Sequence, residues 1–328
     1  MDVSSEIREV ANKYLNKVKP SGPENIMAVC PFHTKGDGRP ENTGSFAMSV
    51  VTGLWFCHSC HEAGNLHTFL RNIGVSPVTV DRFFKPLLEE LNAKHRNGKV
   101  DRRCIQIVID DNPLPDSILG LFEYCPVGLL EEGFTEETLR LFDVGYDQKN
   151  DRVTFPIRDL LGHLVGISGR GSSEWGARYK VYAKNEYDAW NIPPRNTQKS
   201  DFVWNADRVY PRAYFNSEPI IIPIVEGFKA CMWLHQAGFK NTVALMGSWM
   251  SAPQKTILER MGGDYYLFLD NDKAGQNAYQ FVSRSLASSL SSVRIVQYEG
   301  KQPTDLSPTE IQRAIELAPK FHQWALRG

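Results

Sequence analysis

The chain has 328 residues, of which 42% are hydrophobic and 23% charged, and its formal net charge is −1. This length predicts two or three domains, and the composition is typical of a globular protein with more than one core. The longest apolar run, Pro219–Val225, is too short to cross a bilayer, and the N-terminus lacks a signal-peptide pattern. These features exclude a membrane protein, and we expect a soluble, cytoplasmic chain.

The predicted elements of the first third, in chain order, are a helix over Ser5–Val18, strands over Ser45–Val51 and Leu54–Cys57, a short helix from Asn65, and a helix over Val80–Ala93. A polar, charged stretch then predicts a linker over residues 96–104. We expect residues 1–95 to form the first domain.

Four residues of this first domain have the spacing of a zinc site. Cys30 and His33 form one pair and Cys57 and Cys60 another, each separated by two residues, so one tight turn can direct both side chains of a pair at one ion. A module this small buries too little core to fold alone, so the predicted role of the zinc is structural.

Other aromatic and histidine residues of the same segment are open to two interpretations. His33 is the preferred fourth ligand because it completes the first pair, and we expect three nearby histidines to be surface or packing residues: His58, His61 and His67. Three aromatic residues are candidates either for stacking on unpaired bases or for the core: Phe46, Trp55 and Phe56.

The rest of the chain predicts a mixed region followed by a regular one. Residues 105–205 combine strands over Ile105–Ile109, Val153–Ile157 and Leu164–Ile167 with a helix over Thr135–Phe142. In residues 206–328, strands over Ile220–Val225, Thr242–Met246, Tyr265–Leu269 and Val293–Tyr298 alternate with helices over Phe228–Ala237, Ser251–Met261 and Ala274–Leu290. The alternation predicts an α/β parallel sheet flanked by helices, within a chain that is α+β overall.

Acidic residues follow three of these strands. Glu226 comes directly after the first, Asp270 and Asp272 after the third, and Asp305 lies in the loop after the fourth. The carboxyl ends of parallel strands meet at one edge of the sheet, so four carboxylates are expected to converge there. They would repel one another unless Mg²⁺ or Mn²⁺ neutralised them. The alternative is that Asp272 or Asp305 caps a helix.

A basic stretch precedes this region. Lys149–Lys184 holds seven Lys or Arg residues against three acids, although the net charge of the chain is close to zero. Such clustering indicates either a nucleic-acid contact or an ordinary solvated face.

Three groups of residues, in this order, carry a resemblance to a known family. They are Cys30-Pro-Phe-His33 with Cys57-His-Ser-Cys60 and Gly64-Asn65; Phe155-Pro-Ile-Arg-Asp159 with Gly162, Val165–Arg170 and Arg178-Tyr-Lys180; and Val225–Phe239 with Ala244–Ser248 and Asp270–Gly275. The sequence resembles the bacterial DnaG-type primases over nearly its whole length.

The resemblance implies a zinc-ribbon domain, a flexible tether and an RNA polymerase domain built on the TOPRIM fold. Four residues match the acidic cluster that binds the catalytic metal ions: Glu226, Asp270, Asp272 and Asp305. Five lie on or beside the basic template-binding ridge: Arg152, Arg158, Arg170, Arg178 and Lys180. The implied domains are a basic subdomain over residues 105–205 and a TOPRIM catalytic subdomain over residues 206–328.

The chain also departs from the family pattern. Ser307 stands where a second acid is usual, Ala230 replaces an aspartate that follows the TOPRIM glutamate, and Trp204 takes the place of a lysine. The chain ends at Gly328 without the helicase-binding domain of such primases, which indicates either a short phage- or mobile-element-like form or a truncation.

The expected function is therefore DNA-dependent synthesis of short RNA primers on single-stranded DNA. The expected mechanism is two-metal nucleotidyl transfer, with Asp270, Asp272 and Asp305 as metal ligands and Glu226 as a further ligand or a proton acceptor. One structural Zn²⁺, catalytic Mg²⁺ or Mn²⁺, NTPs, a replicative helicase and other replisome proteins are the expected cofactors and partners. The alternatives are a TOPRIM nuclease and a non-catalytic, zinc-containing DNA-binding replication factor.

Overall fold

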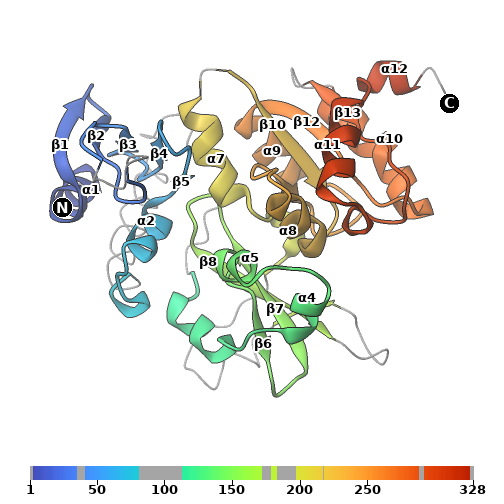
Figure 1. Ribbon diagram of the computed structural model, residues 1–328, viewed down its shortest axis with the longest axis horizontal. Helices are drawn as coiled ribbons and strands as arrows, with labels where there is room; N and C mark the ends of the chain where they lie inside the picture. The colour runs from blue at the N-terminus through green and yellow to red at the C-terminus, as the bar shows by residue number, and fades with distance from the viewer. Residues whose placement is uncertain are drawn as a thin grey trace.

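The computed structural model describes residues 3–34, 41–80, 113–171, 179–182, 197–216, 218–287 and 292–325. Three β-sheets organise them (Figure 1): a five-stranded antiparallel sheet, a four-stranded antiparallel sheet and a four-stranded parallel sheet. The predicted linker 96–104, the predicted strand Ile105–Ile109 and all but the first residue of the predicted helix Val80–Ala93 lie outside the described residues. In the described ranges, no helix is both long and apolar enough to cross a membrane.

The N-terminal unit consists of α1 (Val3–Tyr14), β1 (Asn16–Ser21), β2 (Asn25–Val29), β3 (Phe46–Ser49), β4 (Trp55–Cys57), β5 (Ala63–Gly64) and α2 (Leu66–Asn72). Its strands pair in sequence order, and the unit has a hydrophobic core of its own. The predicted short helix from Asn65 is α2, and Asn65 is its N-cap. The predicted helix Ser5–Val18 is too long. Pro20 favours extended backbone in the residue before it, and Lys17 adopts a φ of 56°, so Asn16 begins a strand instead.

The middle of the chain is mixed, as expected. It contains η1 (Asp116–Phe122), α4 (Val127–Glu131), α5 (Glu136–Leu141), β6 (Gly145–Asp147), β7 (Arg152–Arg158), β8 (Leu164–Gly171) and β9 (Tyr179–Val181). The four strands form an antiparallel sheet in sequence order.

The last part is the expected α/β region. After η3 (Lys199–Asp201) come α7 (Ala206–Phe215), β10 (Ile220–Val225), α8 (Phe228–Gln236), β11 (Val243–Ala244), α9 (Ala252–Met261), β12 (Gly263–Leu267), α10 (Lys273–Ala287), β13 (Val293–Ile295), η4 (Pro303–Asp305), α11 (Pro308–Glu316) and α12 (Phe321–Ala325). The strand order is β11-β10-β12-β13, and every neighbouring pair is parallel.

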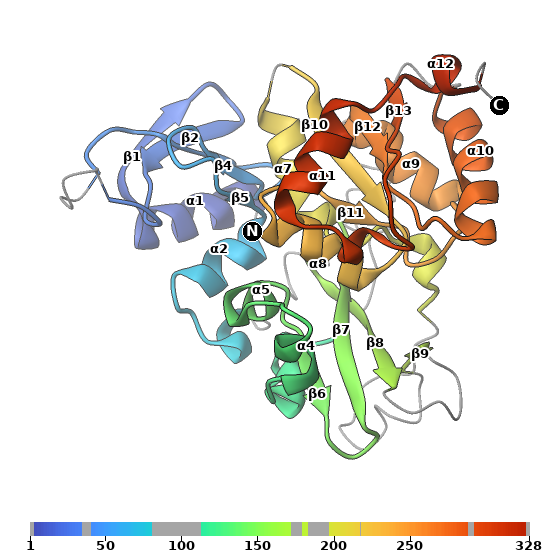
Figure 2. The same cartoon turned by 45° about the vertical axis from the view of Figure 1, so that its right-hand side comes forward.

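Both faces of the parallel sheet are buried. Along β12 and the residues after it, Tyr265 and Leu267 enter one core, whereas Tyr266 and Phe268 enter the other. This is the alternation that a strand imposes on its side chains. Helices α7, α9 and α10 contribute to the first core, and α8 and α11 to the second (Figure 2). The continuous apolar strands of the sequence are explained by this double burial.

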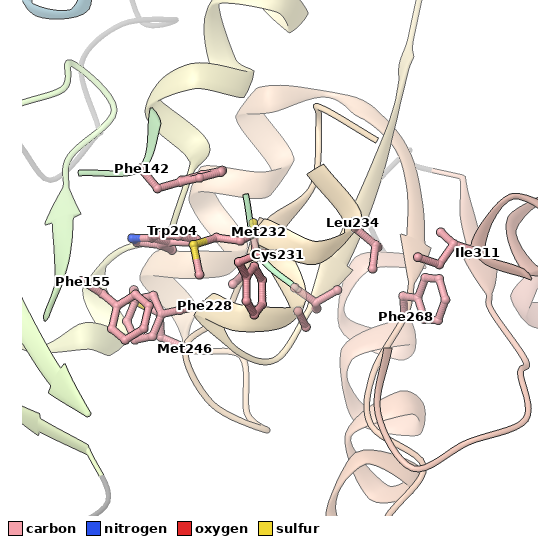
Figure 3. Close-up of a cluster of buried hydrophobic side chains, with 14 of the residues drawn as sticks. Phe142, Phe155, Trp204, Phe228, Cys231, Met232, Leu234, Met246, Phe268 and Ile311 are labelled. Atoms are coloured by element: carbon pink, nitrogen blue, oxygen red, sulfur yellow. The ribbon is translucent and has the colours of Figure 1, made fainter. Parts of the chain in front are cut away.

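The mixed region and the parallel sheet share one core. Phe155 from β7 stacks on Phe228 from α8 with ring centroids 4.7 Å apart, and Trp204 meets Phe228 edge-on at 5.0 Å (Figure 3). Because Trp204 is 3% exposed and lies in this core, the expected boundary between residues 205 and 206 does not separate two hydrophobic cores.

The N-terminal unit packs against the rest of the protein along α7, which lies between this unit and the parallel sheet (Figures 1 and 2). Phe56 from β4 stacks on Phe215 from α7 with ring centroids 6.4 Å apart. Arg71 from α2 donates a hydrogen bond to Asp143 over 2.6 Å. Apolar and ionic contacts thus both hold the unit in place.

Candidate functional site

The predicted zinc ligands Cys30, His33, Cys57 and Cys60 converge in the N-terminal unit. Within the described ranges, they are the only group of three or more His, Cys, Asp or Glu side chains whose ligand atoms all lie within 4.8 Å of one another. The Sγ atoms of Cys30 and Cys60 are 4.0 Å apart, and Cys57 Sγ is 3.8 Å from His33 Nδ1. Tetrahedral Zn²⁺ with Zn–S bonds of about 2.3 Å separates two sulfurs by about 3.8 Å. The donor atoms therefore fit one structural zinc ion.

Neighbouring groups orient these ligands. The Ser59 backbone N–H donates to Cys57 Sγ over 3.4 Å, which is part of the tight turn that the spacing predicted. His33 Nε2 lies 3.3 Å from Glu41 Oε2, so the carboxylate fixes the ring with Nδ1 toward the sulfur atoms. The sequence analysis did not find Glu41, because an orienting acid has no characteristic spacing from the histidine that it contacts.

The other histidines of the segment are surface or packing residues, as expected. His67 is 3% exposed and its Nε2 lies 2.7 Å from Asp116 Oδ2. His58 and His61 are exposed.

The three aromatic candidates belong to the core. Phe46, Trp55 and Phe56 are 0%, 1% and 4% exposed, and Trp55 Nε1 donates to the Asn65 carbonyl over 2.8 Å. Of the two alternatives, the structure therefore favours burial for all three. Phe46 and Trp55 lie in the core of the N-terminal unit, whereas Phe56, on the other face of β4, is buried against Phe215 from α7.

Glu226 and Asp270 meet at the carboxyl edge of the parallel sheet. Glu226 follows β10, and the Asp270 backbone N–H donates to Glu226 Oε1 over 3.3 Å. The first turn of α10 packs closely against both residues at Gly275. A Cβ atom there would lie 2.0 Å from the Asp270 carbonyl oxygen and 2.9 Å from Glu226 Oε1, so only glycine allows this approach.

The environment of Glu226 disfavours negative charge. Burial raises the pKa of Glu226 to about 7, and the charges of Asp270 and Asp272 act in the same direction. A carboxylate pair with this unfavourable electrostatic energy is stabilised by a bound cation, so the site fits the divalent metal ion that the resemblance implies.

Asp272 forms the bond that the capping alternative predicts. Its Oδ1 accepts a hydrogen bond from the Gly275 backbone N–H over 2.8 Å at the start of α10, and the residue is exposed. The structure places Asp272 two residues beyond Asp270 but not among the residues that line the cavity beside Glu226.

Asp305 is occupied within its own turn. Its Oδ2 accepts from the backbone N–H groups of Lys301 and Gln302 over 2.8 and 3.1 Å. Burial would raise the pKa of Asp305, but these bonds outweigh it and lower the pKa. Ser307, at the position where the resemblance expects a second acid, caps α11 by accepting from the Glu310 backbone N–H over 3.4 Å. Glu226 and Asp270 are thus in contact, whereas Asp272 and Asp305 accept hydrogen bonds within their own turns.

Three cationic side chains surround these two acids. A cavity of about 290 Å³ lies beside Glu226 and Asp270 and is also lined by Arg170, Lys199 and Lys229. The sequence analysis did not find Lys199 or Lys229. Lys229 lies in the first turn of α8, three residues after Glu226, so the sequence spacing could have placed it near this acid. Lys199 comes from a separate segment, and its spacing from Glu226 does not indicate proximity. Burial lowers the pKa of both lysines.

The predicted template-binding residues occupy different environments. Arg170 lines the cavity, and Lys180 is exposed on the neighbouring strand β9. Arg152 is half-buried and donates to the Gly169 carbonyl over 3.3 Å. Arg178 lies outside the described residues.

Arg158 is not on a DNA-accessible surface. It is 5% exposed, and its guanidinium donates to Asp116 over 2.9 Å and to Asp143 over 3.1 Å. Arg158 therefore has a structural role, as a partner of two acids, instead of the expected contact with a template. The sequence showed its charge but not the two acids that enclose it.

Two departures from the family pattern have structural explanations. Trp204 is a core residue whose Nε1 donates to the Pro156 carbonyl over 2.7 Å. Ala230 lines the cavity beside Glu226 and is 8% exposed, so the wall lacks a third carboxylate at this position.

Comparisons with known proteins found matches to the N-terminal unit and to the region of the parallel sheet. Residues 1–94 match a family model described as a CHC2 zinc finger, and residues 223–307 match one described as Toprim-like. A DNA primase of Rickettsia conorii is 25% identical over 320 residues, which cover 83% of this chain and 49% of the relative. In both parts the chain is similar to the bacterial DNA primases. It spans about half the length of the curated relatives that it matches first.

Solved structures of primases share the fold. The Aquifex aeolicus primase, comprising zinc-binding and RNA polymerase domains, matches 98% of this chain and 85% of its own with a TM-score of 0.58 and 22% identity. A DnaG primase catalytic domain bound to ssDNA matches 62% of this chain and 77% of its own with a TM-score of 0.50 and 19% identity.

Proposed function

We propose that this chain is the primer-synthesising part of a DNA primase, which joins NTPs into short RNA on a single-stranded DNA template. The observation that carries the proposal is the cavity in which Glu226 and Asp270 face Arg170, Lys199 and Lys229 at the carboxyl edge of a parallel sheet. Acids that hold a divalent cation, next to basic groups that bind phosphates, suit phosphoryl chemistry. The kinship to primases supports the same activity.

The residues of the cavity have separable roles in this proposal. Arg170, Lys199 and Lys229 bind the oxygens of the triphosphate, and Asp270 and Glu226 hold the metal ion, with Asp272 and Asp305 as further ligands. Bound Mg²⁺ or Mn²⁺ supplies Lewis-acid stabilisation of the phosphoryl group and activates the attacking hydroxyl. Glu226 is either a ligand of the metal ion or the acceptor of that hydroxyl's proton, because a bound cation would lower the pKa that burial raises.

The template and partners follow from the same proposal. Arg170, Lys180, Arg152 and Arg178 form the proposed DNA-binding set, without Arg158. The zinc-binding domain, residues 1–95, contacts the template through polar side chains, because Phe46, Trp55 and Phe56 are buried. A linker over 96–104, a basic subdomain over 105–205 and a TOPRIM subdomain over 206–328 complete the proposed organisation, and a replicative helicase in the cytoplasm is the proposed partner.

A priming assay tests the proposal. The full chain is incubated with a mixed-sequence ssDNA template, labelled NTPs and Mg²⁺ or Mn²⁺, and products are separated on a denaturing gel. We expect short RNA products that require template and metal, and that disappear in Asp270→Asn. The matched control is Asp264→Asn, which removes an acid at the opposite end of β12. Template cleavage without RNA synthesis would instead establish a nuclease, and DNA binding without either reaction a non-catalytic factor.

A further inference from the structure

A second and larger cavity lies between the N-terminal unit and the rest of the protein. Its volume is about 640 Å³, and its walls come from α2, α5, α7 and α8 together with the segments next to them. It shares no lining residue with the cavity beside Glu226. Helix α8 contributes to both: Phe228 to Ala230 line the first at its start, and His235 and Gln236 line the second at its end. The two cavities are therefore separate sites.

The walls of this second cavity are rich in positive charge. Five cationic side chains line it, against three acidic ones: Arg71, Arg140, Arg208, Arg212 and Lys240. His235, in the same wall, is neutral at physiological pH, because burial and the charges of Arg212, Arg208 and Lys240 lower its pKa to about 3. The excess positive charge is thus focused in a partly enclosed space, where a bound anion is attracted more strongly than at an open surface.

Two of the three acids in the wall already form ion pairs with arginine or lysine side chains. Asp143 accepts hydrogen bonds from Arg71 and Arg158 over 2.6 and 3.1 Å. Glu62 Oε1 forms an ion pair with Lys240 at 2.9 Å. The other oxygen of Glu62 lies 3.7 Å from Arg212 Nη2, so Glu62 partly neutralises Arg212 as well.

Arg212 has donor capacity that the protein does not use. The residue is 9% exposed, and no hydrogen-bond partner for its buried Nε is found in the described parts of the chain. Nη1 donates to Asn241 Oδ1 over 3.2 Å, and Nη2 lies 3.7 Å from Glu62. Buried donors are rarely left without an acceptor, and guanidinium groups are suited to bind phosphate oxygens in pairs.

We propose that this cavity binds the phosphate groups of a small ligand of the nucleotide or polyphosphate class, with Arg212 and Lys240 as its principal contacts. The volume is within the range of ordinary ligand sites, about 300–1,000 Å³. A phosphate oxygen would supply the acceptor that Arg212 Nε lacks. Because the N-terminal unit and the catalytic part both form the walls, the ligand bridges them.

Isothermal titration calorimetry of the full chain without divalent metal tests this proposal. The titrants are ATP, inorganic pyrophosphate and adenosine. We expect saturable binding of ATP and pyrophosphate and none of adenosine. Pyrophosphate binding as tight as that of ATP would assign the site to phosphate alone, whereas tighter ATP binding would assign it to a nucleotide. Adenosine binding as tight as that of ATP would overturn the proposal.

Four substitutions locate the bound phosphate. Arg212→Met and Lys240→Met should each weaken binding about tenfold, and Glu62→Gln should strengthen it severalfold because it removes a competing negative charge. Lys229→Met should weaken phosphate binding only at the cavity beside Glu226, so the binding event that it leaves unchanged belongs to the second cavity. Lys240 is half-exposed, so its variant is expected to fold even if Arg212→Met does not. Unchanged affinity in Lys240→Met and Glu62→Gln, or a loss confined to Lys229→Met, would refute the assignment.

Discussion

The Asp270 backbone N–H donates a hydrogen bond to the Glu226 carboxylate over 3.3 Å, and this contact joins the segments that follow β10 and β12. The two residues are 44 positions apart in the sequence. Their proximity at one edge of the parallel sheet creates a site of concentrated negative charge, on which the first prediction depends.

Glu226→Gln is expected to raise the melting temperature of the metal-free protein at pH 8 by a few degrees. The substitution removes a charge that burial, Asp270 and Asp272 all disfavour. The same variant should lose metal-dependent primer synthesis. Scanning calorimetry with and without Mg²⁺ checks the first part and the priming assay the second. A variant that is less stable than the wild type without metal would show that Glu226 contributes favourable contacts instead.

Cys57→Ser is expected to release the zinc ion and to unfold the N-terminal unit, while the parallel sheet stays folded. A closed tetrahedral site loses most of its affinity when one thiolate is removed. Elemental analysis and circular dichroism measure the two effects. Cys125→Ser is the control, because Cys125 is exposed and lies outside the zinc cluster. Zinc that remains at one equivalent in Cys57→Ser would contradict the ligand assignment.

The stability of the protein is expected to fall between pH 4 and pH 2 through Asp143. Burial alone would raise the pKa of Asp143, but Arg71, Arg158 and Arg208 lower it to about 2, against an ordinary value of 3.8. A lowered carboxyl pKa stabilises the fold above the unfolded-state value, and this contribution is lost as pH falls through the folded-state value. The loss amounts to about 2 kcal/mol.

Chemical denaturation at pH 7 and at pH 2.5 measures this contribution. Asp143→Asn should be less stable than the wild type at pH 7 by about 3 kcal/mol, because it removes a counter-charge that the buried Arg71 and Arg158 share. The variant should also show a smaller loss of stability on acidification. Asp264→Asn, which changes an acid outside this network, should keep the wild-type pH dependence, and an equal dependence in Asp143→Asn would exclude the mechanism.

Two substitutions of Ser307 test separately whether its side chain caps α11 and whether an acid at this position strengthens metal binding. Ser307→Ala should cost about 1 kcal/mol through loss of the α11 cap, without affecting zinc content. Ser307→Asp should keep the stability, because aspartate also caps helices well, and it supplies the acid that the resemblance expects at this position. Urea denaturation measures the stability, and Mn²⁺ titration of Ser307→Asp measures whether the restored acid strengthens metal binding. If Ser307→Ala is as stable as the wild type, the Ser307 side chain does not stabilise α11 as its cap.

Arg170→Gln and Lys180→Gln should each weaken ssDNA binding severalfold and reduce the slope of log K against log salt concentration by about 0.7. Fluorescence anisotropy at several salt concentrations measures both quantities. Arg313→Gln, an exposed residue on α11, should change neither. Arg158→Met should lower stability instead, because Asp116 and Asp143 then each lose a buried counter-charge. Unchanged salt slopes for Arg170 and Lys180 would place the template elsewhere.

Local spacing determined the zinc site from the sequence. Cys30, His33, Cys57 and Cys60 lie in two pairs whose turns direct the side chains, and the structure joins the pairs as predicted. Apolar periodicity likewise determined the parallel sheet, including the bounds of β10, because a strand buried on both faces must be continuously apolar. Glu226 and Asp270 followed from this topology, since the carboxyl ends of parallel strands coincide.

Tertiary structure decided what local pattern does not encode. Burial made Arg158 a structural residue, although the resemblance had implied a template contact for it, and burial decided that Trp55 belongs to the core, which the sequence had left open. Lys199 joined the cavity beside Glu226, and Arg212 a second one, through packing between distant segments. Charge and ring type are visible in a sequence, but burial and partners depend on which surfaces pack together, and that is a property of the whole fold.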